Sequence, residues 1–265
     1  MGLKEIASKS LFLSGAKSLF KNPGKLCLIV LFDLSFFLTF IFIMPNLAQF
    51  FAQGFLFLDE SFISYVYFAM SVIYSLLMMF IYSFFKYGIL EFIRSMHSKG
   101  QVSLKRLWKF YLLNLVIYAP PYIIFSSFIS GIKEEYRVLV FVIAGVPLAL
   151  FVYLAANFSQ TLFHKGNTLK DSLKRCFELI GKFKQYFEII AVLVLVPLAL
   201  SLLFLIFVYL IKVFTTGNYP SYLVAYSYFK AASVITFDAL AYFVVVVNRV
   251  SFYQICNIQS AKSKK

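Results

Sequence analysis

Two acidic residues lie inside long apolar stretches of this sequence, where a charged side chain is costly. Asp33 follows Lys25 by eight residues, and Asp238 follows Lys230 by eight residues. At about 1.5 Å per helical residue, each carboxylate would lie about 12 Å inside an apolar core about 30 Å thick. A carboxylate at that depth must face protein groups, be paired or be protonated. Proton or cation transport would use such a pair.

The alternative role of these acids is structural. A protonated or hydrogen-bonded Asp joins helices through other intramembrane polar groups, and Asn114 and Asn157 lie in apolar stretches where they could serve. In this interpretation the four residues hold helices together and no ion moves. Both interpretations predict that Asp33 and Asp238 point into a helix bundle, because an unpaired carboxylate in hydrocarbon costs several kcal/mol.

No motif in the sequence indicates catalysis. The chain contains no H-E-x-x-H, no G-x-S-x-G and no phosphate-binding glycine loop. His97 and His164 fall outside the apolar stretches, and neither these two residues nor the three cysteines have the spacing of metal ligands. We therefore expect no enzymatic activity, no cofactor and no metal site, and we expect both histidines to be solvated or interfacial.

Six apolar helices must position these residues. The chain has 265 residues, is 62% hydrophobic and has a mean hydropathy of +0.85. One membrane span needs about 20 mostly apolar residues. Stretches of that kind lie at 25–45, 62–85, 110–130, 138–163, 189–211 and 231–253. The sequence therefore predicts an all-α, polytopic transmembrane helix bundle with six spans, in a single integral membrane domain over residues 1–265.

The net charge of +14 is distributed unevenly along the chain. Of the 25 Lys and Arg residues, 21 lie at the termini and in the connections after spans 2 and 4, on one side of the predicted membrane. The loops on the other side hold Lys133, Arg137, Lys212 and Lys230. An excess of basic residues marks the cytoplasmic side. The pattern predicts a multi-pass protein of the cell membrane with both termini in the cytoplasm, and not a nucleic-acid-binding protein.

Basic amphipathic segments precede spans 3 and 5. At 103–115 and at 168–188, apolar residues recur at three- and four-residue steps with Lys and Arg between them. This pattern is typical of helices that lie in the membrane interface, where Trp108 also fits. The helices either bind anionic lipid of the cytoplasmic leaflet or only cover the bundle. The residues expected to contact lipid are Lys105, Arg106, Lys109, Lys170, Lys174, Arg175 and Lys182.

The two longer connections have the same order of residues. Both run His, then Lys-Gly, then Ser-Leu-Lys-Arg, at 97–106 and at 164–175, and a weaker version stands at 17–25. This order predicts three repeats of one helical hairpin, at 1–96, 97–163 and 164–258, each opened by a basic segment. Chance, or a shared topology without duplication, is the alternative.

With six spans, these basic segments, an Asn-Pro-Gly before the first span and the Lys-Gly connections, the chain resembles prokaryotic six-span membrane domains. One such domain belongs to some glycerophosphodiester phosphodiesterases. The resemblance covers the whole chain, rests on architecture and carries over no catalytic residue. It implies a membrane module that associates with lipid, a membrane-protein partner or a second copy. The alternative function is a small proton- or cation-linked transporter or channel that uses Asp33 and Asp238.

The predicted orientation is open to a direct test. A cysteine introduced for Ser61 or Asn218 should react with a membrane-impermeant maleimide on intact cells, because the loops with few basic residues should face outward. Labelling that occurs only after lysis would show the opposite orientation.

Overall fold

The protein is built from helices throughout the part of the chain that the structure describes. The computed structural model describes residues 10–43, 45–46, 49, 60–97 and 106–262, and contains no strand within them. The all-α prediction is confirmed. The helices are α2 (Leu11–Phe20), α3 (Pro23–Leu38), α5 (Glu60–Ser95), α6 (Leu107–Ser130), α7 (Glu134–Val140), α8 (Val146–His164), α9 (Leu169–Ile180), α10 (Phe187–Phe214) and α11 (Tyr219–Lys262).

Among the described residues, six helical segments are long and apolar enough to cross a membrane, as predicted. They are Pro23–Ile43, Phe68–Ser95, Leu107–Ser130, Glu134–His164, Phe187–Phe214 and Tyr219–Ile258. Each overlaps one predicted span, and most run several residues further at one end or both. A helix continues past the apolar core because its backbone hydrogen bonds are internal, whereas hydropathy marks only the part that fits hydrocarbon.

The contacts divide the chain into two compact units. The central unit is Asn22–Gly181, and the terminal unit joins Met1–Lys21 with Lys182–Lys265. The prediction of a single domain and of three repeats within it stays a prediction. The two units are described one at a time.

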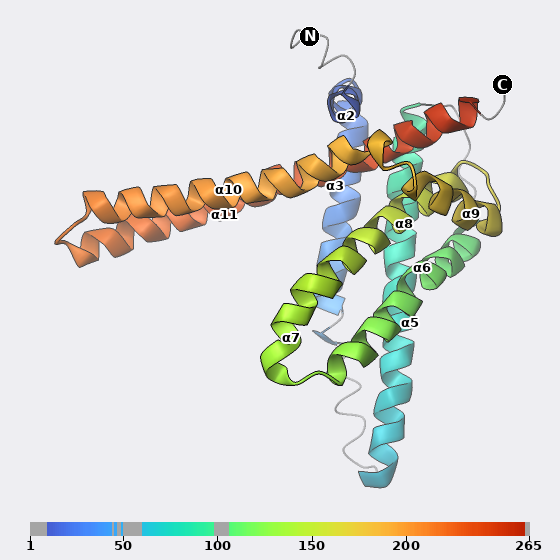
Figure 1. Ribbon diagram of the computed structural model, residues 1–265, viewed down its shortest axis with the longest axis horizontal. Helices are drawn as coiled ribbons and strands as arrows, with labels where there is room; N and C mark the ends of the chain where they lie inside the picture. The colour runs from blue at the N-terminus through green and yellow to red at the C-terminus, as the bar shows by residue number, and fades with distance from the viewer. Residues whose placement is uncertain (1–9, 44, 47–48, 50–59, 98–105, 263–265) are drawn as a thin grey trace. The chain divides into compact units, whose positions relative to one another are not determined.

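In the central unit, successive spans pack against each other: α3 on α5, α5 on α6, and α6 on α8 (Figure 1). Aromatic rings set the register of the first pair. The ring of Phe32 lies so close to Gly88 that a Cβ there would come 2.5 Å from the ring. One turn further along α3, the ring of Phe36 packs against Phe85 and Tyr82. The two helices therefore run antiparallel in close contact.

The fourth span contains one irregular turn. Between α7 and α8, residues Phe141–Gly145 form a π-helix in which the Val146 N–H donates to the Phe141 carbonyl. The next residue, Pro147, has no N–H to continue the regular pattern, which accounts for the irregularity at this place. Pro120 and Pro121 lie within α6, and the helix continues through them.

Helix α9 is amphipathic, as predicted for 168–188, but it is shorter. The Thr168 side chain accepts from the Asp171 N–H and caps its start, and Gly181 follows its last residue. The Lys182–Tyr186 segment that the sequence assigned to the same helix holds a short 3₁₀ turn, Phe183–Gln185, and α10 begins at Phe187. The spacing of apolar residues that predicts the helix continues past its end at Ile180, because apolar residues that lead into α10 follow at similar steps.

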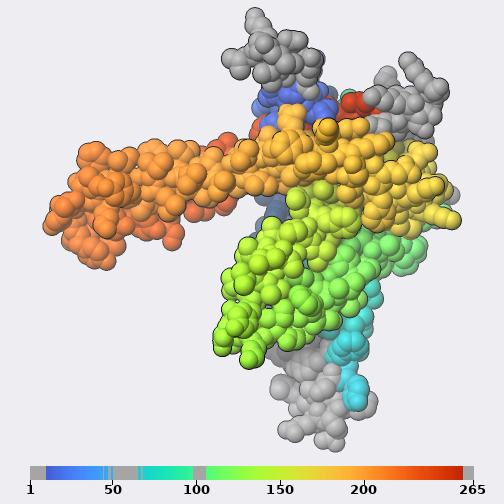
Figure 2. Space-filling view, viewed as in Figure 1, coloured from blue at the N-terminus to red at the C-terminus, as the bar shows by residue number. Residues whose placement is uncertain are grey.

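The terminal unit is a long helical hairpin with one short helix against it. Helices α10 and α11 lie side by side, joined by a turn in which Gly217 has a positive φ of 83° (Figures 1 and 2). An L-residue with a side chain rarely adopts that conformation, so glycine is required there.

Helix α2 is fixed to this hairpin at two places. At its start, Ser10 caps the helix and donates to the Glu188 carboxylate, which also accepts from the Leu11 N–H at 3.0 Å. A carboxylate at a helix N-terminus is favourable because the free N–H groups point at it. Further along, Gly15 lies against α11, where a Cβ would come 2.6 Å from Ser251 Oγ and 3.2 Å from the Val247 carbonyl oxygen.

Two helix pairs, one in each unit, make similar contacts. In the central unit α9 packs on α8, where Phe151, Ala155 and Ser159 follow each other at four-residue steps. Phe151 meets the ring of Phe177 of α9, the Ala155 carbonyl accepts from Cys176, and the Ser159 hydroxyl donates to the Ala155 carbonyl.

In the terminal unit α2 packs on α11, where Phe243, Val247 and Ser251 have the same four-residue steps. Phe243 meets the ring of Phe20 of α2, and the Ser251 hydroxyl donates to the Val247 carbonyl. In both pairs a short helix that opens one predicted repeat packs on the last span of another. Duplication of one hairpin would produce this likeness.

The close approach at Gly15 gives a stability prediction. Gly15→Ala should lower the unfolding temperature in detergent relative to Gly24→Ala, because the new methyl group must displace Ser251 and the α11 backbone, whereas nothing lies within 4 Å of a Cβ at Gly24. Overpacking of this kind costs about 1–3 kcal/mol. A Gly15→Ala protein as stable as the Gly24→Ala protein would show that α2 is not seated as described.

Candidate functional site

The central unit contains a hydrogen-bonded group of polar side chains that joins three of its spans. Asn114 of α6 donates to Ser83 Oγ of α5 at 2.8 Å and accepts from Gln160 Nε2 of α8 at 2.8 Å. All three side chains are fully buried. The Ser83 hydroxyl donates in turn to the Met79 carbonyl of its own helix. Each helix thus contributes one polar side chain to the group, and the Gln160 Oε1 atom has no hydrogen-bond partner among the described residues.

The same group extends to a pair of tyrosines. Gln160 Nε2 also lies 3.4 Å from the Tyr82 hydroxyl, and the hydroxyls of Tyr82 and Tyr118 are 2.9 Å apart. Both tyrosines stand near the middle of their spans, Phe68–Ser95 and Leu107–Ser130. A chain of hydrogen-bonding side chains therefore reaches from α8 to the middle of the α5–α6 pair.

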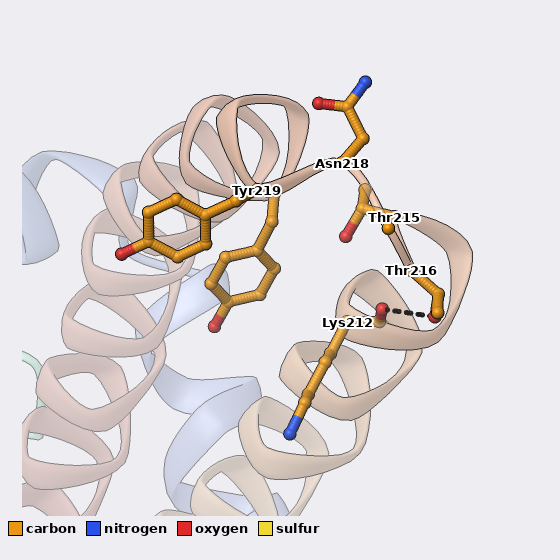
Figure 3. Close-up of a pocket in the computed structure, with 7 residues that line it drawn as sticks. Lys212, Thr215, Thr216, Asn218 and Tyr219 are labelled. Atoms are coloured by element: carbon orange, nitrogen blue, oxygen red, sulfur yellow. Dashed lines mark hydrogen bonds between the residues drawn. The ribbon is translucent and has the colours of Figure 1, made fainter.

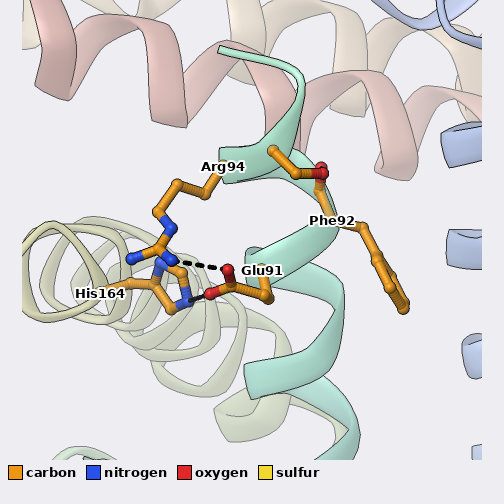
Figure 4. A network of polar contacts seen from close by, with 5 residues as sticks. Glu91, Phe92, Arg94 and His164 are labelled. Carbon is orange, nitrogen blue, oxygen red and sulfur yellow. Dashed lines mark hydrogen bonds and ion pairs between the residues drawn. The ribbon is translucent and has the colours of Figure 1, made fainter. Parts of the chain in front are cut away.

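A second buried cluster lies nearer the C-terminal ends of α5 and α8. Glu91 accepts a hydrogen bond from Arg94 Nη2 at 2.6 Å, and its carboxylate also lies 3.0 Å from His164 Nε2 (Figure 4). Glu91 is 7% exposed and His164 is 3% exposed. The ring of Tyr87 packs against the His164 ring, with centroids 5.1 Å apart. The contact with Arg94 lies within α5, whereas the contact with His164 joins α5 to α8.

His164 corrects an expectation from the sequence. The sequence predicts a solvated or interfacial side chain, because the predicted span 138–163 ends one residue earlier. Helix α8 ends with His164 itself, and the side chain turns into the interior beside Glu91. Glu91 was missed for the same reason, since the second span was placed at 62–85 and α5 continues to Ser95.

The two acids expected from the sequence differ in burial. Asp33, on α3, is 7% exposed, as predicted. Asp238, on α11, is exposed, and the exposed side chains near it on that helix, Ile235 and Leu240, are apolar. The expectation that Asp238 points into a bundle is therefore wrong within its own unit, because α10 packs along another face of α11. The two carboxylates belong to different units.

Asp33 and a buried cation stand at a similar height on two packed helices. In the antiparallel register set by Phe32 against Gly88, Asp33 stands at the level of Lys86, which is also 7% exposed. Burying an uncompensated charge is expensive, so we expect these opposite charges on packed helices to compensate each other. The sequence placed Lys86 in a solvated connection, again because the second span was predicted to end at residue 85.

The two expected amides have different roles. Asn114 joins α5 to α8, as described above. Asn157 is also buried, but it donates to the Tyr153 carbonyl of its own helix at 2.8 Å. Asn157 therefore satisfies a local backbone group, while Gln160, one turn further on, makes the contact between helices.

The residues expected to contact lipid also divide into two kinds. Arg106 is half-buried, donates to the Asn167 carbonyl at 3.1 Å and lies over the Phe163 ring, so it fixes the α8–α9 connection. The exposed cations are Lys109, Lys170, Lys174, Arg175 and Lys182, of which the last lies beyond the end of α9. Lys105 lies outside the described residues.

Each unit contains a cavity lined by described residues. In the terminal unit, a cavity of about 610 Å³ lies at the turn between α10 and α11, beside Lys212, Asn218 and Tyr219 (Figure 3). In the central unit, a cavity of about 390 Å³ lies among α3, α5 and α6. Phe36, Tyr118 and Tyr122 line the second cavity together with five residues of α5, which are Tyr74, Ser75, Met78, Met79 and Tyr82. Asp33 and Asp238 line neither cavity.

Within the described ranges, no group of three or more His, Cys, Asp or Glu side chains could hold a metal ion. The expectation that the chain needs no metal and no cofactor stays an expectation. Of the three cysteines, Cys27 is exposed, while Cys176 and Cys256 are buried. Burial raises the pKa of the Cys176 thiol to about 12, because desolvation disfavours the thiolate.

The shifted pKa gives a prediction for thiol reactivity. At pH 8 the Cys176 thiol should remain protonated and react far more slowly with N-ethylmaleimide in the folded protein than after denaturation, since the thiolate is the nucleophile. A cysteine introduced by Arg175→Cys, one residue away and exposed, should react readily and serves as the control. Equal modification of Cys176 and of the introduced cysteine would contradict the packing of α9 on α8.

No known protein family, no curated protein and no solved structure matches this chain. The resemblance to the membrane domain of some glycerophosphodiester phosphodiesterases therefore stays an expectation.

Proposed function

We propose that this chain is a non-enzymatic membrane module that associates with anionic lipid at the cytoplasmic face. The observation that supports this function best is the way α9 is held. Its inner side, with Ser172, Cys176 and Leu179, is buried, and the helix packs on α8. Its other side presents Lys170, Lys174 and Arg175 to the outside.

A fixed cationic helix is better suited to bind lipid head groups than a mobile one. Because packing on α8 already orders α9, binding does not have to order it again. The Arg106 contact with the Asn167 carbonyl fixes the connection that leads into the helix. The cations on α9 stay near the membrane surface, where each basic residue contributes about 1 kcal/mol of attraction to an anionic leaflet.

The orientation belongs to the same proposal. The connection that carries α9 is on the side of the membrane where 21 of the 25 basic residues are expected. The cytoplasmic leaflet carries the anionic lipids, and the basic side of a multi-pass protein faces it. Topology and lipid preference thus favour the same face.

The test compares two sets of three substitutions. Lys170→Gln, Lys174→Gln and Arg175→Gln together should reduce the phosphatidylglycerol retained on purification, measured by native mass spectrometry. The expected loss is about 1 kcal/mol for each cation, a factor of about five each. The control combines Lys133→Gln, Arg137→Gln and Lys230→Gln, which removes equal charge from the other side. Equal retention by the two triple variants would overturn the proposal.

The second candidate function is proton- or cation-linked transport. It is favoured by ionisable groups within the apolar spans: Asp33 and Lys86 on packed helices, and Glu91 with His164. Intramembrane groups of this kind often belong to ion pathways. Asp33→Asn would preserve the fold yet abolish a pH-dependent flux in liposomes if Asp33 carries ions. An unaltered flux, or none in the parent protein, would exclude that role.

A further inference from the structure

The cavity of the central unit has a composition suited to a particular kind of ligand. It is lined by aromatic rings, hydroxyl groups and two methionines, and none of its lining residues is charged. Its volume of about 390 Å³ falls in the range of small-molecule sites, which is about 300–1,000 Å³. A ligand that binds here must therefore be neutral, with an apolar body.

The cavity lies deep in the membrane-spanning part of the unit. Tyr82 and Tyr118 stand near the middle of their spans, far from both ends. Tyr122, at the edge of the cavity, is 72% exposed, so the cavity opens toward the surroundings of the helices. For spanning helices those surroundings are hydrocarbon at this height. A ligand must therefore arrive through the lipid phase and bring its polar group to mid-bilayer depth, which excludes the head group of a phospholipid.

The pair of tyrosine hydroxyls at the cavity is held in place by Gln160. The Tyr82 and Tyr118 hydroxyls are 2.9 Å apart, and Gln160 Nε2, fixed by its bond to Asn114, lies 3.4 Å from the Tyr82 hydroxyl. A donor group fixed in this way suits a carbonyl oxygen, because little conformational freedom is lost on binding. The Phe36 ring, which packs on Tyr82, offers an aromatic surface for a flat ring, and methionine sulfur also contacts ring edges favourably.

We propose that this cavity binds the carbonyl-bearing ring of a neutral prenyl lipid of the quinone class, with the Tyr82–Tyr118 hydroxyl pair donating to a ring carbonyl. The prenyl tail remains in the hydrocarbon at the open edge beside Tyr122. The site is separate from the basic face of α9, so it stands whether or not the chain binds anionic lipid. The proposal concerns recognition and includes no electron transfer.

The probe is radiolabelled decylubiquinone, offered to the full chain in nanodiscs. The parent protein should bind it saturably, and should bind decylbenzene, which lacks the carbonyls, more weakly. Tyr82→Phe with Tyr118→Phe should weaken decylubiquinone binding by about two- to tenfold, the effect of losing one neutral hydrogen bond. Tyr65→Phe with Tyr209→Phe changes two exposed tyrosines that do not line the cavity, and should leave binding unchanged.

A second variant tests the cavity without touching the hydroxyl pair. Ser75, which lines the cavity and is exposed, can be replaced by a large ring in Ser75→Trp. This variant should abolish saturable binding while α5, α6 and α8 stay packed. Absence of binding in the parent protein, equal binding of decylbenzene, or binding unaffected by Ser75→Trp would each overturn the proposal.

Discussion

The hydrocarbon core of a membrane offers no hydrogen bonds, and the arrangement of the central unit follows from that constraint. Each polar side chain within a span needs a partner inside the protein. Asn114 meets this need by bonding to Ser83 on one side and Gln160 on the other. Because the three residues come from α6, α5 and α8, satisfying them fixes three helices in one register. The Tyr82–Tyr118 pair adds a further contact between α5 and α6, and Glu91 with His164 adds a further contact between α5 and α8.

The same constraint separates the charged groups that are paired inside the protein from those that are exposed and can bind lipid. Arg94 and His164 both contact Glu91, and Lys86 stands at the level of Asp33 on packed helices. The cations on α9 face outward, and their side of the helix is exposed. Glu91 is thus paired with protein groups, and we expect the same of Asp33, whereas the cations on α9 are exposed. This difference is why we propose lipid association first and transport second.

Hydropathy alone predicted the all-α class, the six spans and the amphipathic start of α9, because each depends on composition and period. It failed where the membrane boundary and the helix end differ. Glu91 and His164 lie in helical segments just beyond the predicted spans, so hydropathy does not identify either as a buried group. Gln160 lies in a mostly apolar stretch, and the spacing of polar residues there does not indicate that Gln160 contacts another helix. Asp238 lies within a predicted span, but hydropathy does not predict which face of α11 it occupies, and its side chain is exposed.

A double-mutant cycle on Asn114 and Gln160 tests most directly whether this network holds the central unit together. Asn114→Leu, Gln160→Leu and the double variant would be unfolded thermally in detergent. The account predicts coupling of about 0.6–1.7 kcal/mol between the two sites, the range of hydrogen bonds between membrane helices. Asn114→Leu combined with Asn157→Leu should be additive, because Asn157 bonds to its own helix. Additive effects at Asn114 and Gln160 would contradict the account.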